Sequence, residues 1–174
     1  MLVDNVEYQK RNSRVAFVFS CPGRKEEYAQ AVCSGQTGNN LNDMLCYCHY
    51  KLSDVFHSES KNDYTITNAD TKICYLALSG KTEAAKADIL DSANQKRLLN
   101  ELSEYDFVIA MGDKAKLAIE SLSLKGKKIF SEHLSLQHLN RMYESDLKTP
   151  KERRLDILHY IADNIIREIN KGEM

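Results

Sequence analysis

The sequence lacks a long apolar run: no stretch approaches the roughly 20 consecutive apolar residues that a helix needs to cross a membrane. Its first residues, MLVDNVEYQKRNSR, lack the apolar centre of a signal peptide, which predicts a cytosolic protein. Thiols stay reduced in that compartment, so we expect the five cysteines to be free. Internal repeats, linkers and low-complexity stretches are missing too. The 174 residues should therefore fold as one domain, 1–174. We also expect a monomer.

A strong net charge is also missing, since 24 basic and 25 acidic side chains give −1. The positive charge is nevertheless concentrated. Residues 112–154 contain ten lysines and arginines against six aspartates and glutamates, a local charge of +4. A basic patch of this kind is compatible with contacts to nucleic-acid phosphates, and a solvated helix face is the alternative.

Four short apolar segments, most of them rich in β-branched or aromatic residues, predict β-strands. They are 14–20 (RVAFVFS), 64–69 (YTITNA), 106–111 (DFVIAM) and 127–131 (KKIFS). Residues 72–78 are apolar as well, but their pattern is ambiguous between a strand and a loop.

Apolar residues at helical spacing separate these strands. They predict helices over 39–50, from a cap at Ser92 to about residue 104, and from Gly112 to Leu122. A long C-terminal helix should begin at the capping box Thr149-Pro150-Lys151-Glu152. This alternation predicts an α/β fold, a three-layer α/β/α sandwich around a four-stranded, mostly parallel central sheet.

Ligands bind to such sheets at the carboxyl ends of the strands, where three polar segments of this sequence fall. The first is Ser20-Cys21-Pro22-Gly23, followed by a loop that contains Gly35 and Gly38. Its glycines allow a ligand to approach the backbone, and the next helix begins with amides that could face an anion. A purely structural loop is the alternative.

The other two segments offer hydrogen-bonding side chains. Asn68 carries both a donor and an acceptor, which suits the edge of a pyrimidine. His133 could donate to a leaving group, and residues 136–139 (LQHL) form a loop tip suited to wedging into a base stack. The structural alternative for Asn68 is a side chain that hydrogen-bonds the backbone of a turn. For the segment around His133 it is a surface loop with two incidental histidines.

Taken in order, these segments resemble the uracil-DNA glycosylase superfamily, especially its bacterial and archaeal branch with a Gly-Glu-x-Pro-Gly first motif. Residues 20–23 match the end of that motif, and Gly35, Gly38 and Leu41 match its Gly-x-x-Gly-x-x-Leu continuation. Three more matches follow in the family's order: Ile66-Thr67-Asn68 with the base-reading segment, 109–115 (IAMGDKA) with a strand-to-helix turn, and His133-Leu134-Ser135 with His-Pro-Ser. The match runs from about residue 14 to 141.

The resemblance implies a DNA glycosylase, which cleaves the N-glycosidic bond of uracil or a modified base flipped out of DNA. It implies catalytic roles for His133 and Ser20. The residues expected around the base are Cys21, Pro22, Gly23, Cys33 and Asn68. Those expected to contact DNA are Gly35, Gly38, Lys114, Ser135, Gln137 and Arg141, with Lys116, Lys127 and Lys128 as further phosphate contacts.

The chain departs from the family at the residues closest to the chemistry. Ser20 stands where the branch has an acidic residue that orients the attacking water, and a hydroxyl is a poor general base. Glu26 and Glu27 are the nearest carboxylates. Cys33 replaces the aromatic residue that stacks on the base, and Leu134 replaces a proline.

The branch also carries an iron–sulfur cluster on four spaced cysteines. Here Cys46 and Cys48 are too close together for its Cys-x-x-Cys element, and the other cysteines are scattered. We therefore expect no metal and no other cofactor.

Two explanations fit these departures. The protein removes a base bulkier than uracil, or it binds nucleic acid or a nucleotide without cleaving it. A third reading is an α/β domain with a chance motif match. A family member must bring Ser20, Asn68 and His133 to one cleft, expected to be about the size of a nucleobase.

Overall fold

The computed structural model describes residues 6, 8–142 and 149–171. Residues 1–5 and 7 of the N-terminal segment, and residues 143–148 of the basic segment, lie outside this part of the chain. None of the described helices is both long and apolar enough to cross a membrane.

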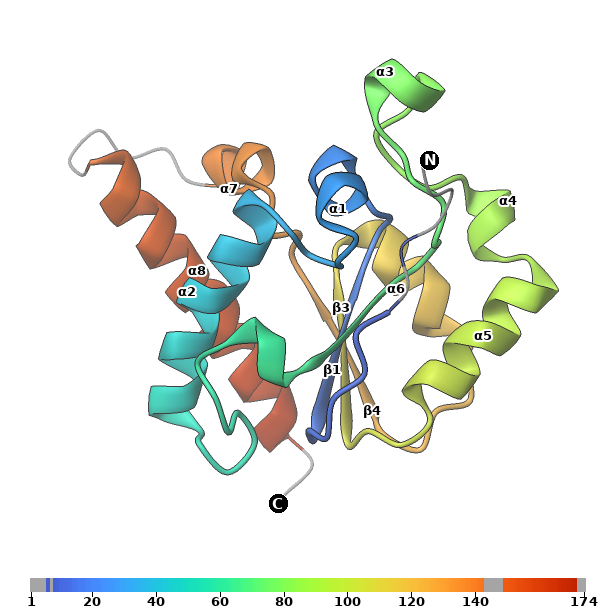
Figure 1. The fold of residues 1–174 in the computed structure, drawn as a ribbon. Coiled ribbons are helices and arrows are strands. Elements are labelled where there is room, and N and C mark those ends of the chain that lie inside the picture. The colour runs from blue at the N-terminus through green and yellow to red at the C-terminus, as the bar shows by residue number, and fades with distance from the viewer. Residues whose placement is uncertain (1–5, 7, 143–148, 172–174) are drawn as a thin grey trace.

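Four strands form one sheet in the order β2-β1-β3-β4, and all neighbouring strands are parallel (Figure 1). Their bounds are β1 Val15–Phe19, β2 Thr65–Asn68, β3 Phe107–Met111 and β4 Lys127–Ser131. Every residue of β1 and β3 is buried, as expected of central strands covered on both faces. The prediction of a four-stranded, mostly parallel sheet is confirmed.

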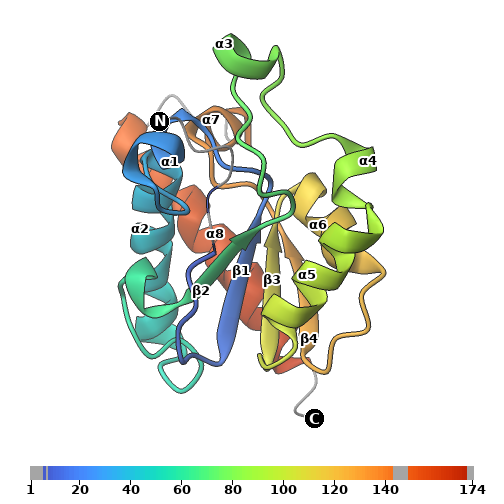
Figure 2. The same cartoon turned by 45° about the vertical axis from the view of Figure 1, so that its right-hand side comes forward.

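Helices cover both faces of the sheet (Figures 1 and 2). Helices α2 (Gln36–Lys51) and α8 (Pro150–Asn170) pack on one face, where Phe17 and Ile109 point. Helices α4 (Lys86–Ile89), α5 (Ser92–Leu102) and α6 (Asp113–Glu120) pack on the other, where Ala16 and Val108 point. Successive strand side chains point to opposite faces, so each strand contributes to both cores. This is the predicted three-layer sandwich.

Four short elements were not predicted: α1 (Arg24–Ala29), α3 (Leu76–Ser79), α4 and α7 (Leu136–Met142), besides a 3-10 turn, η1 (Lys61–Asp63). The ambiguous segment 72–78 is a loop that runs into α3. The loop tip expected at residues 136–139 is instead the start of α7. Leu139 is fully buried there, whereas Leu136 is 44% exposed, so Leu136 is the leucine of this segment that is free to contact a base, and the wedge stays a prediction.

The cap of α5 also differs from the expectation. Asp91, not Ser92, is the N-cap, and its Oδ2 accepts hydrogen bonds from Ala93 N at 3.0 Å and Asn94 N at 3.4 Å. These bonds satisfy two backbone donors that the first turn of a helix leaves free.

Asp91→Ala should therefore lower the free energy of unfolding by about 1 kcal/mol, the usual contribution of such a cap. Ser92→Ala is the matched control and should leave it almost unchanged, because Ser92 lies inside the helix. Urea denaturation of the two variants would measure this difference. Equal losses would show that Asp91 is not the cap.

Candidate functional site

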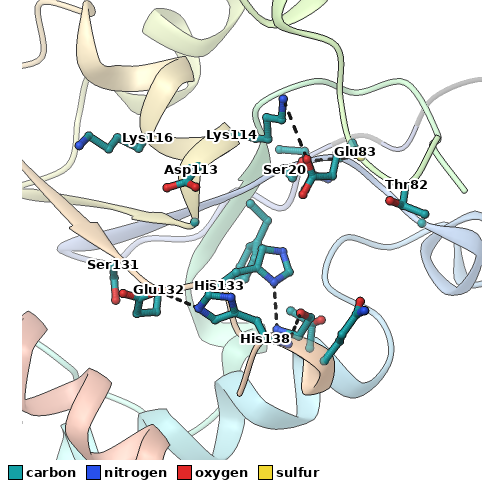
Figure 3. Close-up of a pocket in the computed structure, with 18 of the residues that line it drawn as sticks. Ser20, Thr82, Glu83, Asp113, Lys114, Lys116, Ser131, Glu132, His133 and His138 are labelled. Atoms are coloured by element: carbon teal, nitrogen blue, oxygen red, sulfur yellow. Dashed lines mark hydrogen bonds and ion pairs between the residues drawn. The ribbon is translucent and has the colours of Figure 1, made fainter. Parts of the chain in front are cut away.

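A cavity of about 1060 Å³ opens at the carboxyl edge of the sheet (Figure 3). All four strand ends reach its wall: Ser20 follows β1, Asn68 ends β2, Gly112 follows β3 and His133 lies just after β4. Strand β2 lies on one side of β1, and the chain then crosses over to place β3 on the other side, so the winding direction reverses at β1. Doubly wound sheets bind ligands at such a switch point. The cavity is larger than the nucleobase-sized pocket that was expected, and it lies just above the usual range of about 300–1,000 Å³ for ligand sites.

Most of the residues singled out from the sequence line this cavity. They are Ser20, Cys21, Gly23, Cys33, Asn68, Lys114, His133, Ser135, Gln137 and Arg141. They come from segments separated by up to about 120 residues along the chain, and the parallel topology brings them together. Their roles toward a base or DNA stay predictions.

Three of the residues expected in the first motif and its glycine loop do not line the cavity. Pro22 is buried, and its carbonyl accepts a hydrogen bond from Cys74 N at 2.8 Å. Gly38 is buried inside α2, where a Cβ would lie 1.9 Å from the Cys33 carbonyl oxygen. Gly35 caps α2 at a φ of 137°, which side chains rarely adopt. The two glycines thus have structural reasons to be glycine.

The expected phosphate contacts are divided between the two ends of the sheet. Lys114, Lys116 and Arg141 line the cavity. Lys127 and Lys128 lie at the start of β4, the opposite end of that strand, so their assignment to the same DNA face was wrong. Both lysines donate to carbonyls near the ends of helices: Lys127 to Glu168 O, and Lys128 to Glu120 O at 2.7 Å and Leu122 O at 3.0 Å.

Asn68, in the wall of the cavity, has an unused hydrogen-bond donor. The residue is only 4% exposed, yet its Nδ2 has no partner. A buried polar group without a partner destabilises a fold by about 1–3 kcal/mol, so a ligand acceptor that reached it would recover that loss.

A charged network behind β2 holds the backbone at Asn68. Arg97 Nη2 donates to Asn68 O at 2.8 Å, and its Nη1 donates to Thr67 Oγ1 at 3.1 Å and to Glu101 Oε2 at 2.6 Å. Thr67 Oγ1 also donates to that carboxylate oxygen at 2.6 Å. Arg97 was not predicted, although its spacing to Glu101 on one helix was visible in the sequence.

His133 presents a second donor. Its Nδ1 accepts a hydrogen bond from Ser135 N at 2.9 Å, so a neutral imidazole carries its proton on Nε2. Burial, and then the nearby His138, lower the pKa of His133 from its ordinary value of 6.5. The ring is therefore neutral at neutral pH, with an N–H available for a ligand.

The imidazole is packed between two strand ends. Its ring makes an edge contact with Phe19, with centroids 6.5 Å apart and planes at 85°. On another side lies Gly112, where a Cβ would come within 3.0 Å of His133 Cβ. Gly112 has a φ of 95°, so glycine there allows both this turn and the close approach of His133.

The loop after His133 is tied to two helices by Asn40, which is completely buried. Asn40 Nδ2 donates to Leu134 O at 2.7 Å. Its Oδ1 accepts from Gln36 Nε2 at 3.0 Å and from Arg154 Nη1 at 2.8 Å. Arg154 in turn pairs with Asp43 at 2.6 Å. Asn40 was not predicted, although it lies four residues before Met44 on the buried side of α2.

The cavity contains both signs of charge. Glu132 Oε2 lies within hydrogen-bond distance of His138 Nε2, at 2.7 Å. Glu83 Oε2 lies 4.0 Å from Lys114 Nζ (Figure 3). Glu26 also lines the cavity, and one of its oxygens, Oε2, accepts from Gly23 N at 3.1 Å. Glu27, by contrast, is buried and does not line it. Of the two carboxylates closest to Ser20 in sequence, Glu26 is thus the one at the site.

The stacking position of the family is occupied by Cys33, which is buried in the cavity wall. Burial raises the pKa of its thiol to about 12, so the thiol stays neutral. Phe130, which sequence analysis did not single out, is an exposed aromatic in the same wall, with Lys116 Nζ 5.3 Å from its ring centre.

All five cysteines are free. Within the described residues, no three His, Cys, Asp or Glu side chains gather in a way that would hold a metal ion.

Neither the known protein-family models nor the curated proteins include a match for this chain. The resemblance to uracil-DNA glycosylases therefore stays a prediction from the motifs.

The lowered pKa of His133 predicts how stability depends on pH. Below about pH 6.5 the unfolded chain protonates this imidazole while the folded chain does not, so the unfolding free energy should fall as pH falls through the folded pKa. His133→Asn, whose Oδ1 can replace Nδ1 as an acceptor, should show a smaller fall. Urea denaturation of both proteins from about pH 7 to about pH 5 measures the difference. Parallel pH profiles would contradict the buried, neutral imidazole.

Proposed function

We propose that this chain is a DNA-glycosylase-like protein, which holds a uracil or a modified base flipped out of DNA and cleaves its N-glycosidic bond. One observation carries the proposal: two neutral donors, Asn68 Nδ2 and His133 Nε2–H, belong to the wall of one cavity. A base that leaves as an anion needs donors at its edge. The order and spacing of the four motifs add support.

In the proposed reaction the bond between the sugar C1′ and the base nitrogen breaks, and its electron pair stays with the base. Nε2–H of His133 hydrogen-bonds to a base carbonyl oxygen, where negative charge accumulates, and Asn68 contacts the edge of the base. The sugar passes through an oxocarbenium-like state. Water then adds its oxygen to C1′, and its proton passes to a carboxylate.

Glu26 is our candidate for the group that positions this water. It lines the cavity beside Gly23, and its second carboxylate oxygen is not used in the bond to Gly23 N. Ser20 is nearby, but its hydroxyl stays protonated at neutral pH and cannot take up the proton. Glu27 is buried away from the cavity wall.

Binding without cleavage is the second candidate function, for nucleic acid or a nucleotide. It is favoured by Ser20 at the family's acidic position and by the engagement of Glu26 in the first turn of α1. Under either function we propose a cytosolic monomer that binds DNA or its components and needs no cofactor.

His133→Ala should abolish base release while DNA binding changes little, because this donor acts on charge that appears only as the bond breaks. Loss of such a donor typically lowers the rate about 100- to 1000-fold. Asn68→Ala should weaken both selectivity and rate, since Asn68 contacts the base before and during the reaction. A glycosylase assay on a panel of modified-base oligonucleotides, with single-turnover rates and binding constants, measures these effects.

His57→Ala is the control, because His57 is exposed and does not line the cavity. Glu26→Gln should lower the rate more than Ser20→Ala, and the reverse order would assign the water to Ser20. If wild type releases no base from the panel, the binding-only function takes its place. An active wild type with an equally active His133→Ala variant would refute the role of His133.

Binding to DNA should weaken steeply with salt, because lysines and arginines displace counterions from phosphates. The double variant Lys114→Gln/Arg141→Gln should bind more weakly and reduce the slope of log K against log salt by up to about two. Lys125→Gln is the control, since Lys125 is exposed and lies two residues before β4, at the opposite end of the strand from the cavity. Fluorescence anisotropy at several salt concentrations measures the slopes. Equal slopes for the three proteins would exclude this rim as the phosphate contact.

A further inference from the structure

The cavity reaches beyond the donors of Asn68 and His133 to the last strand of the sheet. Phe130 of β4, Leu117 of α6 and Asn164 of α8 all line it, so the cavity meets β4 from both faces of the sheet. In the described part of the chain no strand pairs with the outer edge of β4. A single flipped base would leave this part of the cavity unfilled.

Phe130 is an exposed aromatic residue in this part of the wall. Its exposed fraction is 42%, whereas Phe19, which also lines the cavity, is 5% exposed and packs against His133. The ring of Phe130 thus keeps a large apolar surface in contact with water, which a planar ligand would cover. Because β4 is the edge strand, the ring has room for such a ligand beside it.

The backbone of Phe130 adds a donor and an acceptor at the same place. Lys127 N donates to Asp106 O at 2.8 Å, toward β3. Ser131 O accepts from Gly112 N at 2.9 Å, again toward β3. Successive residues of a strand bond to opposite sides, so the N–H and C=O of Phe130 point to the outer edge. An exposed ring next to polar backbone groups suits a ligand that is both planar and polar, such as a nucleobase.

Positive charge beside the ring indicates that a phosphate accompanies the base. Lys116 Nζ lies 5.3 Å from the centre of the Phe130 ring, and Lys116 lines the cavity. Figure 3 shows Lys116 and Glu83 on opposite sides of the close-up, so Lys116 is separate from the pair of Glu83 with Lys114. A lysine side chain is long and flexible enough to hold a phosphate while the ring holds the base. Aromatic rings and cations arranged in this way are typical of sites for single-stranded nucleic acid.

We propose that Phe130 stacks on a second base of the same strand, next to the one held at Asn68 and His133, and that the preferred substrate is single-stranded DNA. Lys116 binds the phosphate beside this second base. In a duplex the neighbouring bases cover both faces of the second base, so it cannot lie on the ring. The stack tolerates any sequence, because every base has a π-face. The proposal rests on the proposed function and names its substrate class.

The test measures how the full chain binds three fluorescently labelled probes. They are an oligothymidine strand, the matching duplex, and a strand in which tetrahydrofuran replaces every thymine but one. Fluorescence anisotropy reports binding without catalysis. Wild type should bind the oligothymidine about tenfold more tightly than the other two probes, and Phe130→Ala should bind both single strands equally. Phe130→Ala should leave the salt dependence unchanged, whereas Lys116→Gln should reduce the slope of log K against log salt by about 0.7.

Two matched variants separate stacking from other effects. Phe130→Tyr keeps an aromatic ring and should bind the oligothymidine as wild type does. Tyr160→Ala removes another exposed ring, one that is 59% exposed on α8 and does not line the cavity, and should also behave as wild type. If Phe130→Tyr binds as weakly as Phe130→Ala, the loss does not come from stacking and the proposal fails.

Other results would also overturn the proposal. If Phe130→Ala binds the oligothymidine as tightly as wild type, Phe130 does not stack on a base. If wild type binds the duplex more tightly than the single strand, the substrate is not single-stranded. In both cases base release by wild type would keep the proposed function intact. If wild type binds none of the three probes, both proposals fail.

Discussion

The candidate site depends on the buried amide of Asn40. This one side chain donates a hydrogen bond to the Leu134 carbonyl next to His133. Its oxygen accepts hydrogen bonds from Arg154 of α8 and from Gln36 of its own helix. A buried amide must find partners for its donor and its acceptor, so its position is fixed by all of them at once. The loop that carries His133 therefore has one conformation relative to α2 and α8, although β4 is an edge strand with only one neighbour in the sheet.

The other side of the cavity is fixed in a similar way from behind β2. Arg97 bonds the Asn68 carbonyl and pairs with Glu101, so the charge is used to hold the backbone and not to bind a ligand. The donors that Asn68 and His133 contribute to the cavity wall are neutral. Donors held rigidly in a partly buried site need no reorganisation when negative charge develops, which is how preorganised sites stabilise a transition state. The proposed chemistry therefore depends on geometry more than on net charge.

The fold followed from local patterns. The strands could be predicted because parallel strands buried on both faces give continuous apolar runs, such as VAFVF and FVIAM. Most candidate site residues could be placed for a general reason, since parallel strands bring any residues at their carboxyl ends to one edge. The roles of Asn40 and Arg97 could not be predicted, because their partners are distant in sequence and no local pattern shows which polar side chain will be buried. Lys127 and Lys128 were misplaced because charge was counted along the chain, without regard to which end of β4 they occupy.

The exposure of residues 76–83 has an evolutionary consequence. Because the chain is anchored at Ile73 and Ala84, substitutions, insertions and deletions between them should change the stability of the fold very little. Relatives could thus differ widely in this stretch while the strand ends and the buried network around Asn40 stay constant. Selection for a new binding context could act on residues 76–83 alone, as it does on the hypervariable loops of other rigid scaffolds.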